Sequence, residues 1–299
     1  MILCIDIGGT AIKGAIAHSP EDIRPMRRIA TPARDRAAFD AAIGAVIAQC
    51  PAAEAVAVSI AGVVDPADGR IVVANIPCID GHSLQSELEA RFGLPFLIAN
   101  DADCFALAEA TLGAGKGAEV VFGIILGTGV GGGLIVNRQI VRGAGGFAGE
   151  WGHGPVMPLS AGDPPVSVPQ VKCGCGQTGC LDTLGSARGM ERLHSHLHGA
   201  ELSSTEIVKA WEDGDAAAGR TIEVYIELVS RPLALVINVV GASAVPVGGG
   251  LSNAPKLIVR LDEKVRGMIL QKRTSPLVVP AECRIEPGLI GAAILGFSR

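Results

Sequence analysis

Short apolar runs alternate with amphipathic stretches along this chain of 299 residues, and glycine-rich turns separate many of them. A short unbroken apolar run predicts a strand buried on both faces, whereas apolar residues spaced three and four apart predict a helix. In the first part of the chain, strands are expected at residues 1–7, 11–17, 27–31, 55–61 and 95–99. Helices are expected at residues 36–50, 83–91 and 101–111.

The pattern begins again after the glycine-rich residues 113–117. Strands at 120–126 and 132–136 enclose a glycine turn, as do the strands at 1–7 and 11–17. Later elements are expected as helices at 184–198, 204–213, 216–240 and 287–296, and a strand at 244–247. Two halves that each open with a strand, a glycine turn and a strand predict duplicated α/β units. The boundary is expected near residue 117, giving units of residues 1–117 and 118–287.

Composition and charge narrow the class of protein. The net charge of −5 comes without any basic tract, so binding to nucleic acid has little electrostatic support. The amino-terminal residues lack a basic region and no 18-residue apolar span occurs, so we expect neither a signal peptide nor a membrane partner, and a cytoplasmic location. In that compartment, the eight cysteines argue against a disulfide framework.

Three glycine turns are candidates for binding a nucleotide. In Asp6-Ile7-Gly8-Gly9-Thr10, glycines would let backbone N–H groups approach phosphate oxygens, and Asp6 could position a hydrated Mg²⁺. The turn Gly127-Thr128-Gly129-Val130-Gly131 repeats this logic, and Gly249-Gly250 follows a strand where it would suit an adenosine. The alternative interpretations are an ordinary hairpin turn for the first and close helix–strand packing for the last.

Asn100-Asp101 lies where an expected strand ends and a helix begins. In α/β folds this is a usual place for an active-site side chain, and a carboxylate there can accept a proton from a hydroxyl nucleophile. Asn and Asp are also the favoured residues at helix N-caps. Local spacing by itself favours the cap.

A Cys₃His set within about thirty residues is suited to tetrahedral zinc. Its members are His153, Cys173, Cys175 and Cys180. The carboxylates of Glu150 and Asp182 flank the set. Buried free thiols and a hydrogen-bonded histidine are the alternative, but a glycine-rich, polar cysteine run is poor core material. With four protein ligands the zinc would be structural.

The remaining cysteines and histidines give weaker signals. The other cysteines have mostly apolar neighbours and are expected to fill the core. His194, His196 and His198 alternate along an expected helix. Because helical residues two apart do not face each other, we expect these three to face solvent rather than to bind a second metal.

Taken together, these residues resemble the ROK family of bacterial sugar kinases and repressors, and within it the N-acetylglucosamine kinases. The resemblance covers essentially the whole chain. It is carried by Asp6–Thr10, Ala74-Asn75-Ile76-Pro77, Asn100-Asp101, Gly127–Gly133, Glu150-Trp-Gly-His153, Cys173–Cys180, Gly249-Gly250-Leu251-Ser252-Asn253 and the closing Gly288-Leu-Ile-Gly-Ala-Ala. The order and spacing of these motifs are more specific than any one of them.

The resemblance implies an α/β fold of the two-lobed actin/hexokinase-like (ribonuclease H-like) ATPase type with a zinc-binding loop, in which a C-terminal helix at about 288–299 completes the first lobe. It implies transfer of phosphate from ATP-Mg²⁺ to the 6-hydroxyl of an N-acetylhexosamine, with Asp101 as the general base. The sugar would be held by Asn75, Asn100, Asp101, Glu150, His153 and Asp182. ATP would be bound by Asp6, Gly8, Gly9, Thr10, Lys13, Gly127, Thr128, Gly129, Gly131, Gly249 and Gly250. A homodimer or a dimer of dimers is expected.

Two departures from the family pattern bear on the identity of the sugar. Asp182 stands where relatives usually have Glu, and Ala61-Gly62 stands where many have Pro-Gly. N-acetylglucosamine is the expected substrate, with N-acetylmannosamine, glucose and fructose as alternatives. The family's repressors carry a winged-helix segment ahead of the first glycine motif, and Asp6 is the sixth residue here, so we expect a kinase. A non-catalytic sugar-binding module would not need both Asp101 and the phosphate turns.

Overall fold

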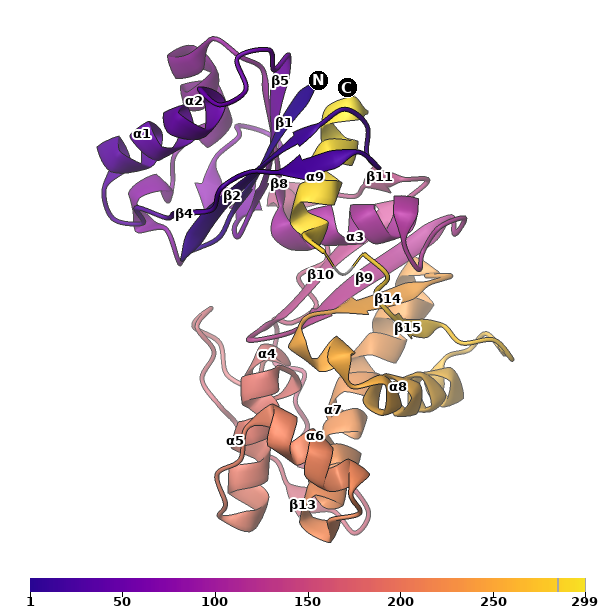
Figure 1. The fold of residues 1–299 in the computed structure, drawn as a ribbon. Helices are drawn as coiled ribbons and strands as arrows, with labels where there is room; N and C mark the ends of the chain where they lie inside the picture. Colours follow the sequence, from indigo (N-terminus) through magenta and orange to yellow (C-terminus); the bar gives the residue numbers. More distant parts are fainter. Residues whose placement is uncertain (284, 299) are drawn as a thin grey trace. The chain divides into compact units, whose positions relative to one another are not determined.

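The computed structural model describes residues 1–283 and 285–298 (Figure 1). The chain packs into two compact units. The first consists of Met1–Lys116, Gly133–Ala148 and Cys283–Arg299, and the second of Gly117–Gly132 and Gly149–Glu282. The expected boundary near residue 117 lies beside the first change of unit, but residues 133–148, expected in the second unit, belong to the first.

Close packing on a helix explains where residues 133–148 belong. A Cβ atom at Gly133 would lie 2.7 Å from the carbonyl oxygen of Ala102, so glycine is needed for this segment to reach the helix. Further along, the guanidinium of Arg142 donates a hydrogen bond to the carbonyl oxygen of Ile98 at 3.2 Å. Neither contact has a signal in local hydrophobic periodicity.

The first unit is built on a mixed sheet with strand order β3-β2-β1-β5-β8, in which β4 also pairs with β2. Its strands are β1 (Ile2–Ile7), β2 (Ala11–Ala17), β3 (Ile23–Pro25), β4 (Ile29–Ala30), β5 (Ala55–Ile60) and β8 (Phe96–Asn100). Its other elements are α1 (Arg36–Ile47), β6 (Val63–Val64), β7 (Ile71–Val72), η1 (Pro77–Ile79), α2 (Leu84–Phe92), α3 (Asp101–Leu112), β11 (Gln139–Ile140), η2 (Ala144–Gly146) and α9 (Pro287–Phe297). Strands β1, β5 and β8 run parallel, so their carboxyl ends share one edge of the sheet.

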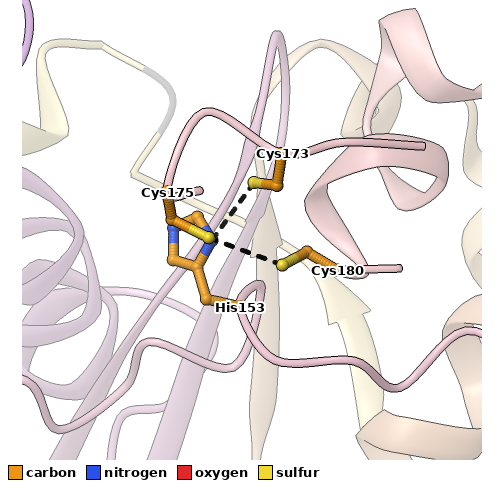
Figure 2. Close-up of side chains that lie close together, drawn as sticks. All are labelled: His153, Cys173, Cys175 and Cys180. Carbon is orange, nitrogen blue, oxygen red and sulfur yellow. Dashed lines mark hydrogen bonds between the residues drawn. The ribbon is translucent and has the colours of Figure 1, made fainter. Parts of the chain in front are cut away.

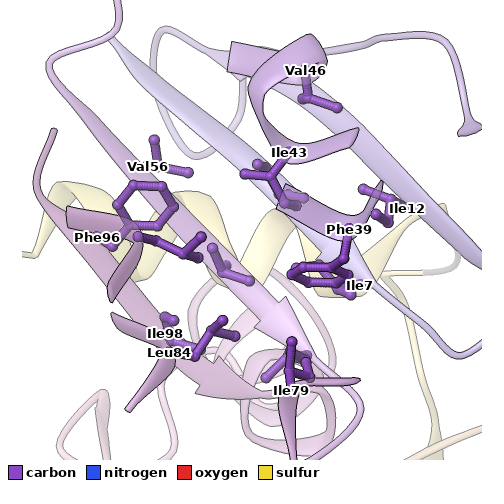
Figure 3. Close-up of a cluster of buried hydrophobic side chains, with 14 of the residues drawn as sticks. Ile7, Ile12, Phe39, Ile43, Val46, Val56, Ile79, Leu84, Phe96 and Ile98 are labelled. Atoms are coloured by element: carbon purple, nitrogen blue, oxygen red, sulfur yellow. The ribbon is translucent and has the colours of Figure 1, made fainter. Parts of the chain in front are cut away.

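Alternate residues of the central strands enter two separate cores. Leu3, Ile5 and Ile7 point to a core shared with α1 and α2, which includes Phe39 and Leu84 (Figure 3). Ile2 and Cys4, which alternate with them along β1, pack with Ala57 and with residues of α9. In Figure 1, α9 (yellow) lies beside β1 and β5 and also against α3. Because both faces of the sheet are covered, these strands are apolar on both sides except at Asp6 and Ser59, as the run of apolar residues in the sequence predicted.

The second unit combines a sheet with helices. The sheet has strand order β11-β10-β9-β14-β15. Its strands in this unit are β9 (Val120–Leu126), β10 (Val130–Val136, which continues into the first unit), β14 (Val245–Gly248) and β15 (Val278–Pro280). The other elements are β12 (Ser160–Ala161), β13 (Val166–Ser167), α4 (Asp182–Gly185), α5 (Ala187–His198), α6 (Ser204–Glu212), α7 (Ala216–Val240), η3 (Gly250–Asn253) and α8 (Pro255–Met268).

Buried polar side chains of the second unit form hydrogen bonds between its helices and the neighbouring elements. Asp262 on α8 is 3 % exposed, and its Oδ1 accepts hydrogen bonds from the backbone N–H groups of Leu277 and Val278 at 2.8 and 2.9 Å. The expectation that His194 faces solvent is wrong: it is buried and its Nδ1 lies 2.8 Å from Thr221 Oγ1 on α7.

In the described part of the chain, no helix combines the length and apolar character that crossing a bilayer requires.

Candidate functional site

The first glycine turn joins β1 to β2, and charged groups surround the strand residue that precedes it. Ser59 Oγ donates a hydrogen bond to Asp6 Oδ1 at 2.8 Å. Lys13 is the antiparallel partner of Asp6, with its Nζ 3.9 Å from Asp6 Oδ2 and 2.7 Å from Glu286 Oε2. Burial raises the pKa of Asp6, while the Ser59 hydrogen bond and the Lys13 charge oppose the rise.

Glycine is needed at two positions around the first turn, at Gly288 against Asp6 and at Gly9 against Asn75. A Cβ atom at Gly288 would lie 2.8 Å from Asp6 Oδ1 and 2.9 Å from Ser59 Oγ. A Cβ atom at Gly9 would lie 2.8 Å from the Cβ atom of Asn75, so Asn75, expected to bind sugar, lies directly against the turn expected to bind phosphate. The carbonyl oxygen of Gly8 accepts a hydrogen bond from the hydroxyl of Thr31 at 2.6 Å, which anchors the turn.

Asn100 and Asp101 lie at the N-terminus of α3, where their side chains make different contacts. Asn100 is the N-cap of α3, as local spacing favoured, and its Oδ1 accepts from the N–H groups of Ala102 and Asp103 at 2.8 and 3.4 Å. Its amide also donates to the carbonyl oxygen of Gly62 at 3.0 Å. Asp101 is the first helical residue and half-buried, with Oδ1 2.9 Å from Ala102 N. The positive end of the helix dipole stabilises a carboxylate there.

The second and third glycine turns lie against each other in the second unit. A Cβ atom at Gly249 would lie 2.5 Å from the carbonyl oxygen of Leu126 and 2.8 Å from the backbone N of Gly127. Gly249 has φ +84°, a conformation that favours glycine. A Cβ atom at Gly250 would meet no atom within 4 Å, so the backbone there is open to a ligand. The two turns expected to bind ATP in this unit are therefore brought together.

The four predicted zinc ligands converge on one point (Figure 2), and their ligand atoms all lie within 4.8 Å of one another. Cys175 Sγ lies 3.6 Å from Cys180 Sγ, and Cys173 Sγ lies 3.7 Å from His153 Nδ1. Zinc bonds of about 2.3 Å to sulfur and 2.0–2.1 Å to nitrogen give tetrahedral edges of about 3.8 Å and 3.6 Å respectively. The donor set therefore fits zinc in both chemistry and spacing.

The second nitrogen of His153 faces a carboxylate. His153 Nε2 lies 3.7 Å from Glu150 Oε2, and each side chain is about one third exposed, at 34 % and 32 %. Burial raises the pKa of Glu150, with the His153 charge lowering it and Asp182 raising it. The arrangement leaves Nδ1 for the thiols and Nε2 for the polar surface beside Glu150.

Asp182 and Trp151 both contact the turn between β9 and β10. Asp182 Oδ1 accepts a hydrogen bond from the backbone N–H of Val130 at 2.8 Å. Trp151 Nε1 donates to the carbonyl oxygen of Gly131 at 2.8 Å, and its ring packs edge-on against Phe122. Sequence reasoning missed the role of Trp151, although a tryptophan between two candidate site residues was an available signal. It also missed Ser59 and Glu286, for which the sequence offers no signal.

The comparisons with known proteins agree over the whole chain. The model of the ROK family matches residues 2–298. The N-acetyl-D-glucosamine kinase of Salmonella arizonae is 34 % identical over 301 residues, which covers 99 % of each chain. The solved ROK hexokinase of Thermus thermophilus has a TM-score of 0.83 at 28 % identity, covering 98 % of this chain and 97 % of that one.

A second similar solved structure contains bound ligands. The ROK family glucokinase of Streptomyces griseus, in complex with glucose and AMPPNP, has a TM-score of 0.76 at 29 % identity, covering 98 % of both chains. The resemblance seen in the sequence motifs is thus confirmed by the family model, by a full-length relative above 30 % identity and by the fold. The chain belongs to the ROK family.

Proposed function

We propose that this ROK family member, an ATP-dependent sugar kinase, transfers the γ-phosphoryl group of ATP to the 6-hydroxyl of N-acetyl-D-glucosamine, giving N-acetyl-D-glucosamine 6-phosphate. The observation that carries the choice of sugar is the 34 % identity, over 99 % of each chain, to an N-acetyl-D-glucosamine kinase. Asp101, half-buried at the start of α3, supports the chemistry.

Asp101 is the proposed general base. Asn100 already caps α3, so the fold does not depend on Asp101 for that purpose. The helix dipole favours the ionised carboxylate, the form that accepts a proton from the sugar hydroxyl as the bond to phosphorus forms. Asn100, Asn75, Glu150 and His153 are proposed to hold the sugar hydroxyls and the acetamido group. When the sugar hydroxyl is held in place beside the base, the correct geometry accelerates the reaction in addition to the proton transfer itself.

The backbone N–H groups of two glycine turns are proposed to bind the phosphates. In the first unit the turn is Gly8–Thr10, and in the second it is Gly127–Gly131, beside which Gly249 and Gly250 offer open backbone for the nucleoside. Mg²⁺ carried by ATP neutralises phosphate charge, and the carboxylate of Asp6 is the proposed group that holds it, directly or through water. Lys13 would neutralise phosphate charge beside it.

Zinc is proposed to bind His153, Cys173, Cys175 and Cys180 as a structural ion. With four protein ligands the ion has no open position, so it would fix the loop rather than activate water. The role of this chain's residues is then orientation: His153, held through Nδ1, presents Nε2 beside Glu150, where both can meet sugar hydroxyls. Membership of the family also supports a homodimer or a dimer of dimers.

Release of ADP in a coupled assay with ATP-Mg²⁺ tests the choice of sugar. N-acetylglucosamine, N-acetylmannosamine, glucose and fructose are compared by kcat/KM at equal enzyme concentration. The proposal requires the highest value for N-acetylglucosamine. An equal rate on all four would indicate a broad hexokinase, and a preference for either sugar without the acetamido group would refute the assignment.

A further inference from the structure

Asp182 is expected from the family pattern to hold a sugar hydroxyl, but one oxygen of its carboxylate, Oδ1, is engaged by the turn, while Oδ2 lies 3.9 Å from Cys173 Sγ. Oδ1 accepts the hydrogen bond from Val130 N at 2.8 Å, and Val130 is the residue at which β10 begins after the glycine turn. The backbone of Asp182 is fixed as well, because its own N–H donates to the carbonyl oxygen of Gly152 at 2.9 Å. Both ends of the residue are thus held within the second unit.

The turn receives hydrogen bonds from both sides of the cysteine loop. Trp151, which precedes the loop, donates to Gly131 O at 2.8 Å, and Ala187 N, which follows it, donates to Gly127 O at 2.8 Å. A Cβ atom at Gly129 would lie 2.8 Å from Asp182 Oδ1, so the carboxylate fits against bare backbone. Glycine samples many backbone conformations, and a turn this rich in glycine needs outside contacts to hold one geometry.

We propose that Asp182 is a positioning residue for the nucleotide: its carboxylate fixes the Gly127–Val130 backbone in the conformation that binds ATP phosphates. The inference rests on the proposed function in assigning the phosphates to this turn. Of the three contacts to the turn, the Asp182 hydrogen bond is the one made by a side chain to a backbone N–H of the turn, at Val130, where β10 begins.

The length of the side chain fits this role. The side chain of Asp182 is shorter than a glutamate by one carbon–carbon bond of about 1.5 Å, and its carboxylate lies directly against Val130 N and the bare backbone of Gly129. Glu150, on the other side of the cysteine loop, remains as the carboxylate of this unit beside His153. The two carboxylates are thereby assigned to different substrates, Asp182 to the nucleotide and Glu150 to the sugar.

Calorimetric titration of the zinc-loaded protein with AMPPNP-Mg²⁺, in the absence of sugar, tests this assignment. Asp182→Ala should weaken nucleotide binding about tenfold, because the hydrogen bond to Val130 N–H is lost and that buried donor is left unpaired. Asp182→Asn keeps an acceptor for Val130 N–H and should stay within about threefold of the original Kd. Glu150→Ala is the matched comparison: it should weaken binding of N-acetylglucosamine while leaving the nucleotide Kd unchanged.

Hydrogen–deuterium exchange of the peptide containing residues 127–133 gives a readout independent of catalysis. Exchange there should be faster in Asp182→Ala and near normal in Asp182→Asn. If Asp182→Ala does not fold, Asp182→Glu carries the test, with weaker nucleotide binding expected.

Two results would overturn the inference. One is unchanged nucleotide affinity in Asp182→Ala together with lost sugar affinity, which would make Asp182 a sugar ligand. The other is weakened nucleotide binding in Asp182→Asn equal to that in Asp182→Ala, which would mean that the charge and not the hydrogen bond matters. Failure of the unsubstituted protein to bind AMPPNP-Mg²⁺ would instead refute the proposed function on which the inference rests.

Discussion

Replacing Asp101 with Asn removes the proposed base while changing little else in the structure. The Asn side chain is nearly isosteric and keeps an oxygen to accept the hydrogen bond from Ala102 N, now at 2.9 Å. The capping bonds of Asn100 are untouched. The loss of a negative charge at the helix N-terminus should lower the free energy of unfolding by about 0.3–1 kcal/mol. Loss of general-base assistance should lower kcat by about 10²–10⁴-fold.

Steady-state release of ADP gives kcat, and calorimetry gives the Kd for N-acetylglucosamine, which should change little. Asp35→Asn is the matched control, because Asp35 is the N-cap of α1 and its Oδ1 accepts from Ala38 N at 3.0 Å. This control should lose similar stability and keep its kcat. A kcat in Asp101→Asn within about threefold of normal would refute the reasoning, since a general base contributes far more than that.

Three further predictions follow from named contacts. Ser59→Ala removes a hydrogen bond that lowers the pKa of Asp6, so the pKa of Asp6 should rise further. Asp6 is then protonated at a higher pH, and the acidic limb of the profile of kcat against pH should move to higher pH. Ser230→Ala also removes a buried hydroxyl and should leave the profile in place. Cys175→Ala should lower both bound zinc, measured by plasma mass spectrometry, and sugar affinity, whereas zinc loss with an unchanged KM would contradict the coupling. Asp262→Ala leaves two buried N–H groups unpaired, at about 1–3 kcal/mol each, and should lower the free energy of unfolding, measured in urea, by about 2–6 kcal/mol, with exposed Asp213→Ala as the control.

The elements that the sequence predicted well are those specified by local signals. The strands at 1–7 and 55–61 are covered on both faces and are therefore apolar except at Asp6 and Ser59, near their carboxyl ends. Asn100 caps α3, as its residue type suggested, and Gly93 ends α2 in the left-handed conformation that glycine favours. The Cys₃His cluster was predictable because its residue types and spacing are those that suit a tetrahedral zinc site.

The features that the sequence did not reveal depend on tertiary partners. His194 is buried because Thr221, on another helix, offers a hydrogen-bond partner that helical periodicity cannot show. Residues 133–148 join the first unit through packing at Gly133. The contact of Asp182 with Val130 joins residues 52 positions apart, and a motif-based assignment to sugar could not have anticipated it.

The position of the phosphate on the product sugar shows which hydroxyl Asp101 deprotonates. The protein is incubated with ATP-Mg²⁺ and N-acetylglucosamine, and the product is analysed by phosphorus–proton correlation NMR. We expect a phosphomonoester coupled to the two protons on carbon 6, and no sugar-dependent release of ADP with the 6-deoxy sugar. A phosphate on any other carbon, or equal ADP release with the 6-deoxy sugar, would contradict it.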